Sequence, residues 1–381
     1  MRTFAIFFLF TLQIAFGLET RLLRPPNLGS EAIGRKIVCY RPMRDSIPNF
    51  SLEEQGKKIL IHNYGHGGAG WSLSVGSVFY SYNLLKEALP YLKKSTPIAI
   101  VGSGCIGLFT AYHLWNEGFK NITIYTKKFE DLTSHHAGGL LSYRAVYSNQ
   151  DANRLILKMG EETYGFFRLI AEGECPDFPM GASVLPTYFE SLVDSELEDL
   201  VGRGMQPAKE VVVDFGSGVK REMIVYDDSL FIDTGAMMDQ LKSYLCPKIS
   251  FNKHTVKAFA DLQERIIFNC TGLGAKELNQ DDHMYPVEGH LIMLQNQKPE
   301  ELQYMLIVNF ELEEDENKKI FRTLDFFPKK LSCAAFDEIG VLGGTFIENC
   351  DTLELKIDEF ELMLDRAKHF FYQNNIPQNN P

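Results

Sequence analysis

The 381-residue sequence lacks most of the signals that mark disulfide-bonded, zinc-binding or nucleic-acid-binding proteins. Its seven cysteines are widely spaced and include no CxxC pair, so neither a disulfide framework nor a metal site is expected, although one isolated disulfide stays open. No basic run or basic–aromatic stripe occurs, and the formal net charge is −12, which argues against a nucleic-acid partner. Without repeats or long linkers, a chain with 45% hydrophobic residues is typical of a globular protein with room for two domains.

The start of the chain differs from the rest. Met1 and Arg2 provide positive charge, Thr3–Phe16 is almost wholly apolar, and the small residue Gly17 follows. This arrangement predicts a signal peptide over residues 1–17, because the apolar run is shorter than the ~20 residues that a spanning helix needs. We therefore expect an exported protein, periplasmic or secreted, with no stable membrane span after the leader is removed. A membrane anchor formed by residues 3–17 is the alternative.

Strand and helix signals alternate through the first part of the chain. Thr96–Val101 is predicted as a buried strand, Cys105–Glu117 as a helix that stops at Gly118, and Asn121–Tyr125 as the next strand. A crossover of this length is what two parallel strands require. The same patterns predict strands at Lys58–Asn63, Arg265–Asn269, Gly289–Leu294 and Glu338–Phe346, and helices at Ser77–Leu89, Asn153–Ala171, after Asp233-Thr234, and at Leu353–Gln373.

A GxGxxG fingerprint, Gly102 to Gly107, joins the first of these strands to its helix. In a strand–turn–helix context this motif indicates a dinucleotide site. Gly102 permits the tight turn, Gly104 lets the backbone approach a pyrophosphate, and Gly107 lets the helix pack closely on the strand. The free amides and the dipole of the helix would then hold the phosphates.

The acidic residue that usually binds the ribose hydroxyls after the second strand is missing. Tyr125 is followed by Thr126, Lys127 and Lys128, and the first carboxylate is Glu130. Either Glu130 takes this role or the adenosine end is held differently. Lys127 and Lys128 would also suit a 2′-phosphate, which keeps NADP as an alternative cofactor.

The run His62–Ser72, HNYGHGGAGWS, is the most distinctive stretch of the chain. Its glycines between Gly65 and Gly70 indicate backbone in unusual torsions or close to a bulky ligand. The turn precedes a helix, so its amides could face an oxygen-rich group such as a flavin ring carbonyl. His62 and His66 are spaced like a metal pair, but the glycines argue against a regular helix, and we expect structural hydrogen bonds from both.

This run resembles the FAD-binding signature of the D-amino-acid oxidase family. Further stretches resemble the same family: Tyr40–Arg44 its RPxR segment, Phe129–Ser134 with Ala137–Leu140 its second flavin contact, Asn269–Gly272 and Pro286–Gly289 two more stretches, and Leu342–Phe346 a strand near the isoalloxazine. The order differs, because in the family the fingerprint glycines open the chain and HNYGHGG closes it. The resemblance therefore implies a circular permutation, with Ser77–Leu89 as the family's last helix and the new ends between Gln373 and about Arg21.

The resemblance implies an FAD-dependent oxidase. Arg41 matches the arginine that clamps the substrate carboxylate, and a guanidinium suits this role because it makes paired hydrogen bonds. The carbonyl of Gly68 would accept from the substrate amine, the flavin would take hydride from the α-carbon, and O2 would reoxidise the flavin to give H2O2. Two family tyrosines align with Phe321 and Asp325. Asp325 would bind a second amine or a basic side chain, or repel a carboxylate.

The resemblance also implies the cofactor contacts and the domains. One group of contacts is Gly102, Gly104, Ile106, Gly107, Thr133, Ser134, Gly138, Gly139 and Leu140; the other is Gly68, Ala69, Gly70, Trp71 and Ser72; Val256 and Thr271 flank the adenosine end. We expect an α/β fold with a circularly permuted, Rossmann-like FAD-binding domain (22–147, 224–285 and 333–373), a strand-rich α+β substrate domain (148–223 and 286–332) and a disordered tail at 374–381.

Three functions follow from these observations. The first is an FAD-dependent oxidase that uses O2 to oxidise a D-amino acid or a related amine. The second is an NADP-dependent reductase, which Lys127 and Lys128 favour and the HNYGHGG turn opposes. The third is a flavin-binding protein that has lost oxidase activity, which the two missing tyrosines favour and Arg41 opposes.

Overall fold

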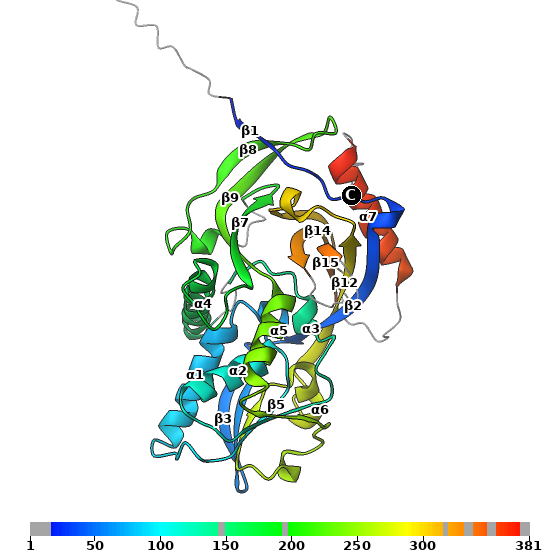
Figure 1. The fold of residues 1–381 in the computed structure, drawn as a ribbon. Coiled ribbons are helices and arrows are strands. Elements are labelled where there is room, and N and C mark those ends of the chain that lie inside the picture. Colours follow the sequence, from blue (N-terminus) through cyan, green and yellow to red (C-terminus); the bar gives the residue numbers. More distant parts are fainter. Residues whose placement is uncertain are drawn as a thin grey trace, which may run out of the picture.

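The described part of the chain forms two β-sheets, one above the other in Figure 1. The structure, a computed structural model, describes residues 17–143, 149–192, 197–314, 319–330, 338–348 and 356–373. The predicted leader, apart from Gly17, and the predicted tail 374–381 lie outside these ranges. Within them, no helix is both long enough and apolar enough to cross a membrane.

The lower sheet has six strands in the order β10-β6-β5-β11-β4-β3, all parallel except β3, which is antiparallel to β4. Alternation along the central strand explains its two faces. Ile98 and Ile100 pack among helix residues, whereas Ala99 and Val101 pack with Val256 and its neighbours. The strands are β3 (Asn49–Gln55), β4 (Lys58–Tyr64), β5 (Ile98–Val101), β6 (Ile122–Thr126), β10 (Ser250–Lys253) and β11 (Ile266–Asn269), and the helices of the first face are α1 (Ser74–Ala88), α2 (Cys105–Asn116), α4 (Gln150–Ala171) and α5 (Thr234–Leu245).

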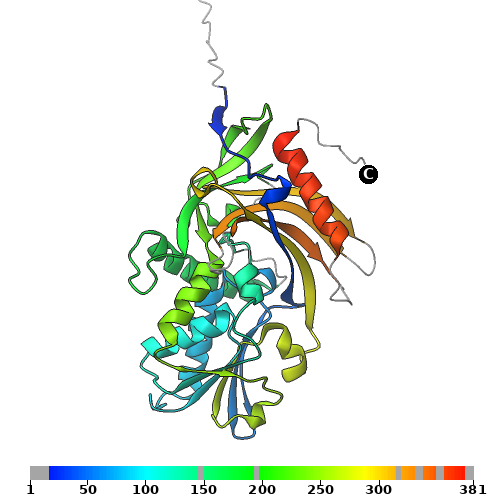
Figure 2. The ribbon, with the colours of Figure 1, turned by 45° about the vertical axis from the view of Figure 1, so that its right-hand side comes forward.

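The upper sheet has nine strands in the order β1-β8-β9-β7-β13-β14-β15-β12-β2. Helix α7 (Ile357–Tyr372) covers one face, where Leu324 and Phe326 pack with Phe360 (Figure 2). On the opposite face, which we call the inner face, Phe327 packs with Leu291. The strands are β1 (Glu19–Leu22), β2 (Ile33–Arg44), β7 (Ala182–Phe189), β8 (Lys209–Asp214), β9 (Lys220–Ile232), β12 (Met284–Gln295), β13 (Met305–Glu314), β14 (Lys319–Lys330) and β15 (Glu338–Ile347); the short helices α3 (Thr133–His136) and α6 (Ala275–Leu278) lie in connections.

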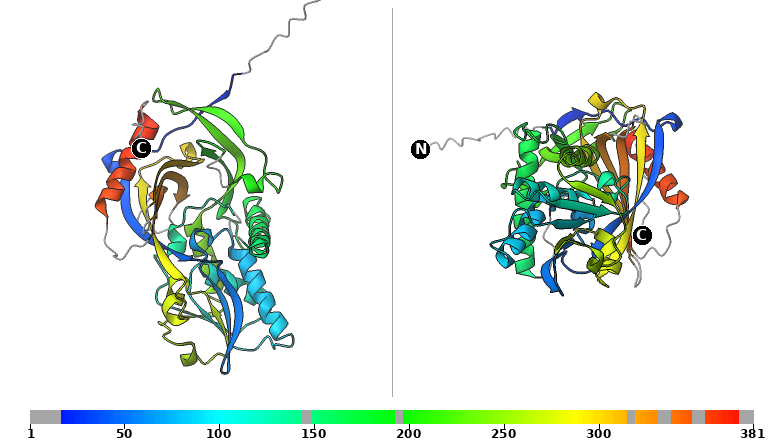
Figure 3. Two further views of the ribbon diagram at one scale, coloured as in Figure 1. Left: turned by 180° about the vertical axis from the view of Figure 1, so that it is seen from behind. Right: turned by 60° about the horizontal axis from the view of Figure 1, so that its bottom comes forward.

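The predicted α/β fold class is confirmed. The strand–helix–strand unit appears as β5, α2 and β6 within one or two residues of its predicted bounds. The two sheets correspond to a Rossmann-like cofactor domain and a strand-rich second domain. Long strands β2 and β12 pair antiparallel and lead from one sheet to the other (Figure 3).

Several segments of the expected FAD-binding domain pair within the nine-stranded sheet. The resemblance places 33–44, 224–232, 338–347 and 357–372 in that domain, and these residues form β2, part of β9, β15 and the helix α7 that covers the sheet. Conversely, α4 packs on α1, where Thr163 Oγ1 accepts from the Gly76 amide at 3.0 Å. Strand pairing joins segments that are distant in sequence, so local composition does not tell which sheet receives a strand.

Candidate active site

Loops that carry the predicted cofactor residues meet at one edge of the six-stranded sheet. The parallel strands β4, β5, β6 and β11 end at Tyr64, Val101, Thr126 and Asn269. Carboxyl ends of parallel strands lie at one edge, and open α/β sheets bind ligands in the crevice outside that edge. The glycine-rich turn after β4 therefore lies near the fingerprint after β5, with β11 between the two strands.

The fingerprint glycines have the geometry that the motif requires. Gly102 has a φ of +112°, and a Cβ there would lie 2.2 Å from the Cys270 carbonyl oxygen. A Cβ at Gly107 would lie 2.0 Å from the carbonyl oxygen of Gly102. Gly104 is the N-cap of α2. The first amides of a helix have no partner within the helix, so this turn is suited to bind phosphate oxygens.

Hydrogen bonds join three predicted contact regions. Ser134 Oγ accepts from the Cys105 amide at 3.0 Å, and the Ser134 carbonyl accepts from Trp71 Nε1 at 3.0 Å. The Trp71 ring is buried, 6.1 Å from that of Phe109 between centroids. The side chains of Trp71 and Ile106 thus belong to the core, and Ser72 is also buried. Any cofactor contact from these three residues would have to come mainly from the backbone.

The same edge leaves space where a cofactor would lie. A Cβ at Gly68 would find only Cδ of Arg41, at 3.9 Å, and a Cβ at Gly70 would find nothing closer than 3.9 Å. Between them, Ala69 is partly exposed. His66 is buried, which lowers its pKa to about 3, and its Nε2 has no hydrogen-bond partner among the described residues. The neutral His66 ring thus has a nitrogen without a partner, next to glycines that leave free space. This arrangement fits a large ligand with a polar edge.

The histidines of the turn are not arranged as metal ligands. His62 Nδ1 lies 3.1 Å from Asn269 Nδ2, and its Nε2 lies 3.4 Å from Glu53. These contacts agree with the structural hydrogen bonding that the sequence predicts for His62. Across the ranges that the structure describes, no cluster of three or more His, Cys, Asp or Glu side chains could hold a metal ion.

Residues predicted near the adenosine end lie at the same edge. The Thr271 amide would be 3.3 Å from a Cβ on Gly102, and Val256 packs in one cluster with Val101. Lys127 and Lys128 are exposed after β6, and Lys128 pairs with Asp131. The Glu130 carboxylate is largely exposed and lies 3.6 Å from Nζ of Lys242. Lys128 and Glu130 therefore form ion pairs at the surface and do not build a buried acidic site for the ribose.

The segment Thr133–Leu140, which we call the 133–140 segment, passes between the two sheets. Gly139 has a φ of +120°, and its carbonyl accepts from the Ile232 amide at 2.7 Å. A Cβ at Gly138 would lie 2.7 Å from the Phe327 ring. Glycine is therefore required at both positions by the approach of β9 and β14. Leu140 forms a β-bridge with Phe231 and packs against the inner-face cluster.

Arg41 lies on the inner face beside the glycine-rich turn. Its Nη1 donates to the carbonyl of Thr345 at 2.9 Å and lies 3.4 Å from that of Glu288, and the guanidinium lies 5.0 Å from the Phe346 ring centroid. Nε and Nη2 have no hydrogen-bond partner among the described residues. A guanidinium held through Nη1 alone keeps two nitrogens, Nε and Nη2, that can donate to a carboxylate.

The two residues that replace the family tyrosines lie along the neighbouring strands. Phe321 pairs with Phe346, and Asp325 pairs with Gly343, across β14 and β15. Phe321 therefore extends the wall on which Arg41 rests. Both Phe321 and Asp325 are partly exposed.

The second arginine of the RPxR segment has a structural role that the sequence did not reveal. Arg44 Nε lies 3.0 Å from Oδ2 of the buried Asp281, which also accepts from the Tyr64 hydroxyl at 2.8 Å. Burial opposes ionisation, but hydrogen bonds from Tyr64 and Arg44 lower the pKa of the Asp281 carboxyl. This pair anchors the start of the glycine-rich turn. Its signal in the sequence, a lone aspartate far along the chain, is too weak to have identified it.

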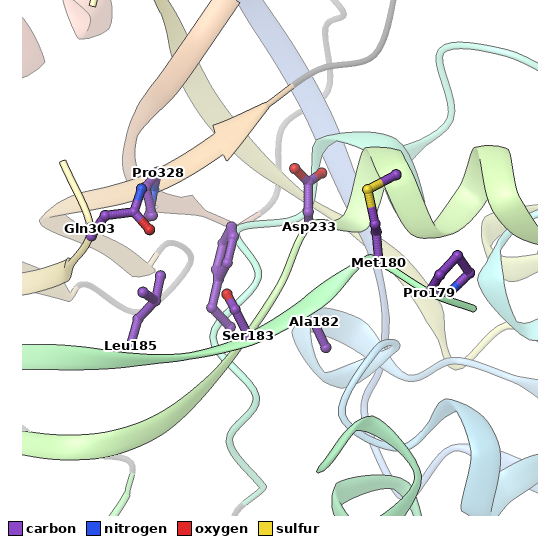
Figure 4. A pocket seen from close by; sticks show the side chains of 10 residues that line it. Pro179, Met180, Ala182, Ser183, Leu185, Asp233, Gln303 and Pro328 are labelled. Carbon is purple, nitrogen blue, oxygen red and sulfur yellow. The ribbon is translucent and has the colours of Figure 1, made fainter. Parts of the chain in front are cut away.

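A cavity of about 340 Å³ adjoins this region without containing any predicted site residue (Figure 4). Phe231, which bridges Leu140, lines one side. The Asp233 carboxylate lines another, but it already accepts from the amides of Ala236 and Lys330 as the N-cap of α5. The cavity therefore borders the 133–140 segment, and its carboxylate is already engaged at the start of α5.

Residues 97–379 match the family model of the FAD dependent oxidoreductases. A D-amino-acid oxidase from Dictyostelium discoideum is 26% identical over 212 residues, which cover 52% of this chain and 57% of that protein. This chain thus spans little more than half the length of that relative.

Solved structures resemble the fold more distantly. The deglycating enzyme fructosamine oxidase (Amadoriase II) from Aspergillus fumigatus superposes with a TM-score of 0.48 and 16% identity, over 76% of this chain and 75% of that one. L-proline dehydrogenase from P. horikoshii gives a TM-score of 0.48 and 14% identity, over 73% and 77%.

The chain belongs to the FAD dependent oxidoreductase family, because the family model covers well over half of it. It is therefore an enzyme of this family, and its cofactor is FAD. The resemblance to D-amino-acid oxidases is confirmed. The NADP alternative is not supported. The residues that the structure gathers at the edge of the six-stranded sheet fit FAD: the fingerprint would hold its phosphates, and the glycine-rich turn and the 133–140 segment would hold its flavin end.

Proposed function

We propose that the protein oxidises a small amino acid or related amine, with D-amino acids as the first candidates and O2 as the electron acceptor. Bound FAD would supply the hydride acceptor. The observation that carries the proposal is Arg41: its guanidinium is held through Nη1, its Nε and Nη2 remain as donor nitrogens, and Cδ of its stem lies beside Gly68 of the glycine-rich turn. The D. discoideum relative, a D-amino-acid oxidase, supports the same substrate class.

The chain's own residues would bind and orient the substrate. Arg41 would fix the carboxylate, and the Gly68 carbonyl would accept from the amine. Phe346 and Phe321 would form an apolar wall that limits water near the reacting carbon. No side-chain base is needed, because positioning the α-carbon against the flavin is the main requirement.

Asp325 would favour substrates with a second positive charge. It lies on the strand next to Gly343, one strand away from the Phe346 on which the Arg41 guanidinium rests. A guanidinium and a carboxylate along one wall suit a substrate with a carboxylate and a cationic side chain. A dicarboxylic substrate would meet repulsion at the same position.

The unusual order of the motifs supports circular permutation. The family match begins just before β5, so the glycine-rich turn lies outside it although it lies beside the fingerprint in space. The Tyr372 hydroxyl near the end of α7 donates to the Pro26 carbonyl at 2.7 Å, so the segments flanking the proposed new ends are close.

Export by residues 1–17 remains part of the proposal.

A peroxide assay tests this function. The flavin-loaded protein would be given D-amino acids with neutral, basic and acidic side chains, their L-enantiomers, and amines that lack the carboxylate. We expect turnover with at least one D-amino acid, and a preference for basic over acidic side chains that Asp325→Asn removes. Activity confined to amines without a carboxylate would contradict the role of Arg41.

A flavin-binding protein without oxidase activity is the second candidate. It is favoured by Asp325, which stands where the resemblance places a tyrosine. Tight FAD binding together with no turnover of any substrate in the panel would favour it over the oxidase.

A further inference from the structure

Lys329 is a buried cation that the proposed chemistry does not use. It lies on β14 with 1% of its surface exposed, and burial lowers the pKa of its ammonium group to about 7. Its Nζ donates to the Ala137 carbonyl at 2.9 Å, to the Thr234 hydroxyl at 2.5 Å and to the His135 carbonyl. Since an ammonium group has three N–H donors, each has an acceptor.

These acceptors connect three parts of the fold. His135 and Ala137 belong to the 133–140 segment, and Thr234 begins α5. The Thr234 hydroxyl is itself 3.2 and 3.1 Å from the same two carbonyl oxygens. Lys329 therefore joins β14, α5 and the 133–140 segment at one point.

The remainder of the segment is held by backbone bonds to β9. The Ile232 amide donates to the Gly139 carbonyl at 2.7 Å, and the Leu141 amide donates to the Leu230 carbonyl at 3.0 Å. Lys329 fixes the earlier residues, next to Ser134, whose hydroxyl bonds the first amide of α2. The orientation of Ser134 relative to the fingerprint thus depends on a side chain from the other sheet.

We propose that Lys329 is a positioning residue for FAD, which holds the 133–140 segment in the conformation that receives the cofactor. This inference rests on the assignment of that segment to the FAD site. An apolar side chain at this position would leave the two carbonyls with the Thr234 hydroxyl as their shared donor. A hydroxyl has one hydrogen, so one carbonyl would lose its partner and the segment would rearrange.

Proton loss from Lys329 should weaken the same contact. The titratable groups around it are Asp233 at the N-cap of α5, Cys39 on β2, and His135 and His136 in the segment. Burial lowers the pKa of His135 to about 4 and lowers that of His136, so neither ring gains charge near neutrality. Burial raises the pKa of Cys39 and of Asp233. FAD affinity should therefore fall as the pH rises through about 7, where Lys329 loses its third donor.

The test is FAD titration of the full-length apoprotein, followed by flavin fluorescence, at pH values on either side of neutrality. Lys329→Met should raise the Kd for FAD at least about tenfold and remove its pH dependence. It should also accelerate amide hydrogen exchange across residues 132–140 in the apoprotein. Lys330→Met is the matched control, because Lys330 is adjacent and exposed, and it should change neither quantity. Lys329→Gln keeps two N–H donors and should give an intermediate Kd.

The site assignment and the role of Lys329 fail in different ways. Ser134→Ala tests the segment itself and should weaken FAD binding. If Ser134→Ala weakens binding and Lys329→Met does not, Lys329 has no positioning role. If neither variant weakens binding, the segment is not part of the FAD site. Should Lys329→Met fail to fold, a Lys329→Gln variant that binds FAD like the wild type would overturn the proposal.

Discussion

Replacing Arg41 by methionine should separate substrate binding from cofactor binding. Methionine is unbranched, as the arginine stem is, and fills similar space without donors. The lost donors would be Nε and Nη2, which have no partner among the described residues, while Nη1 is anchored to the Thr345 carbonyl. We therefore expect Arg41→Met to bind FAD like the wild type and to turn over carboxylate substrates poorly.

The size of the loss follows from the two missing hydrogen bonds. Each bond between a guanidinium and a carboxylate contributes about 1.5–3 kcal/mol. Because Arg41 is partly exposed, the lower values apply, and the pair contributes about 3 kcal/mol. This corresponds to roughly a hundredfold loss in kcat/KM.

The assay compares the best D-amino acid of the panel with the amine that lacks its carboxylate. Arg41→Met should lose activity on the amino acid and change little on the amine, so that the two rates converge. Lys36→Met, an exposed cation on the same strand, serves as the control and should change neither rate. Equal losses on both substrates, or loss of FAD from Arg41→Met, would refute the carboxylate-clamp reasoning.

Other changes should separate structure from function at neighbouring positions. Arg44→Met should lower the free energy of unfolding of the apoprotein by about 3 kcal/mol in urea denaturation, because it leaves Asp281 buried without its cation. Since the pKa of Asp281 is lowered in the folded state, the ion pair stabilises above the ordinary pKa of an aspartate, and the mutational difference should shrink as the pH falls below it. Gly107→Ala should abolish FAD binding in a fluorescence titration, because its Cβ would lie 2.0 Å from the Gly102 carbonyl oxygen. Thr345→Val should raise KM for the amino acid by about tenfold, while Thr345→Ser should restore it, because the hydroxyl accepts from the His290 amide at 2.7 Å and fixes the carbonyl that holds Arg41.

Local patterns predicted the cofactor half of the molecule well. The strand–turn–helix around Gly102–Gly107 could be predicted because turn geometry, helix packing and phosphate binding all demand glycine at fixed spacing. The observed φ at Gly102 and the close approach at Gly107 are the physical basis of that signal. The turn His62–Ser72 was similarly informative, because its glycines and the residues beside them form one short, continuous motif in the sequence.

Assignment of strands to sheets could not be predicted in the same way. Residues 338–347 form β15, paired on both sides with strands of the nine-stranded sheet, although the sequence pattern favoured the cofactor domain. A buried apolar strand has the same composition in either sheet, and only long-range pairing decides its place. Arg41 and Phe346 lie together because β2 and β15 both contribute to the inner face of this sheet.

Buried polar partners were also beyond local patterns. Lys329 lies two residues after Phe327 in a strand that ends FFPKK, where the two lysines look alike in sequence. In the structure Lys329 is buried and Lys330 is exposed. Alternation along β14 places Phe327 and Lys329 on the same face, but none of the predicted strands included these residues.

The most direct test of the account is the visible spectrum of the purified protein under anaerobic conditions, before and after a D-amino acid is added. We predict a flavin spectrum that bleaches on addition of the substrate, and that stays oxidised when Arg41→Met is mixed with the same substrate on the same timescale. A colourless protein that takes up no added FAD would contradict the assignment of FAD as the cofactor.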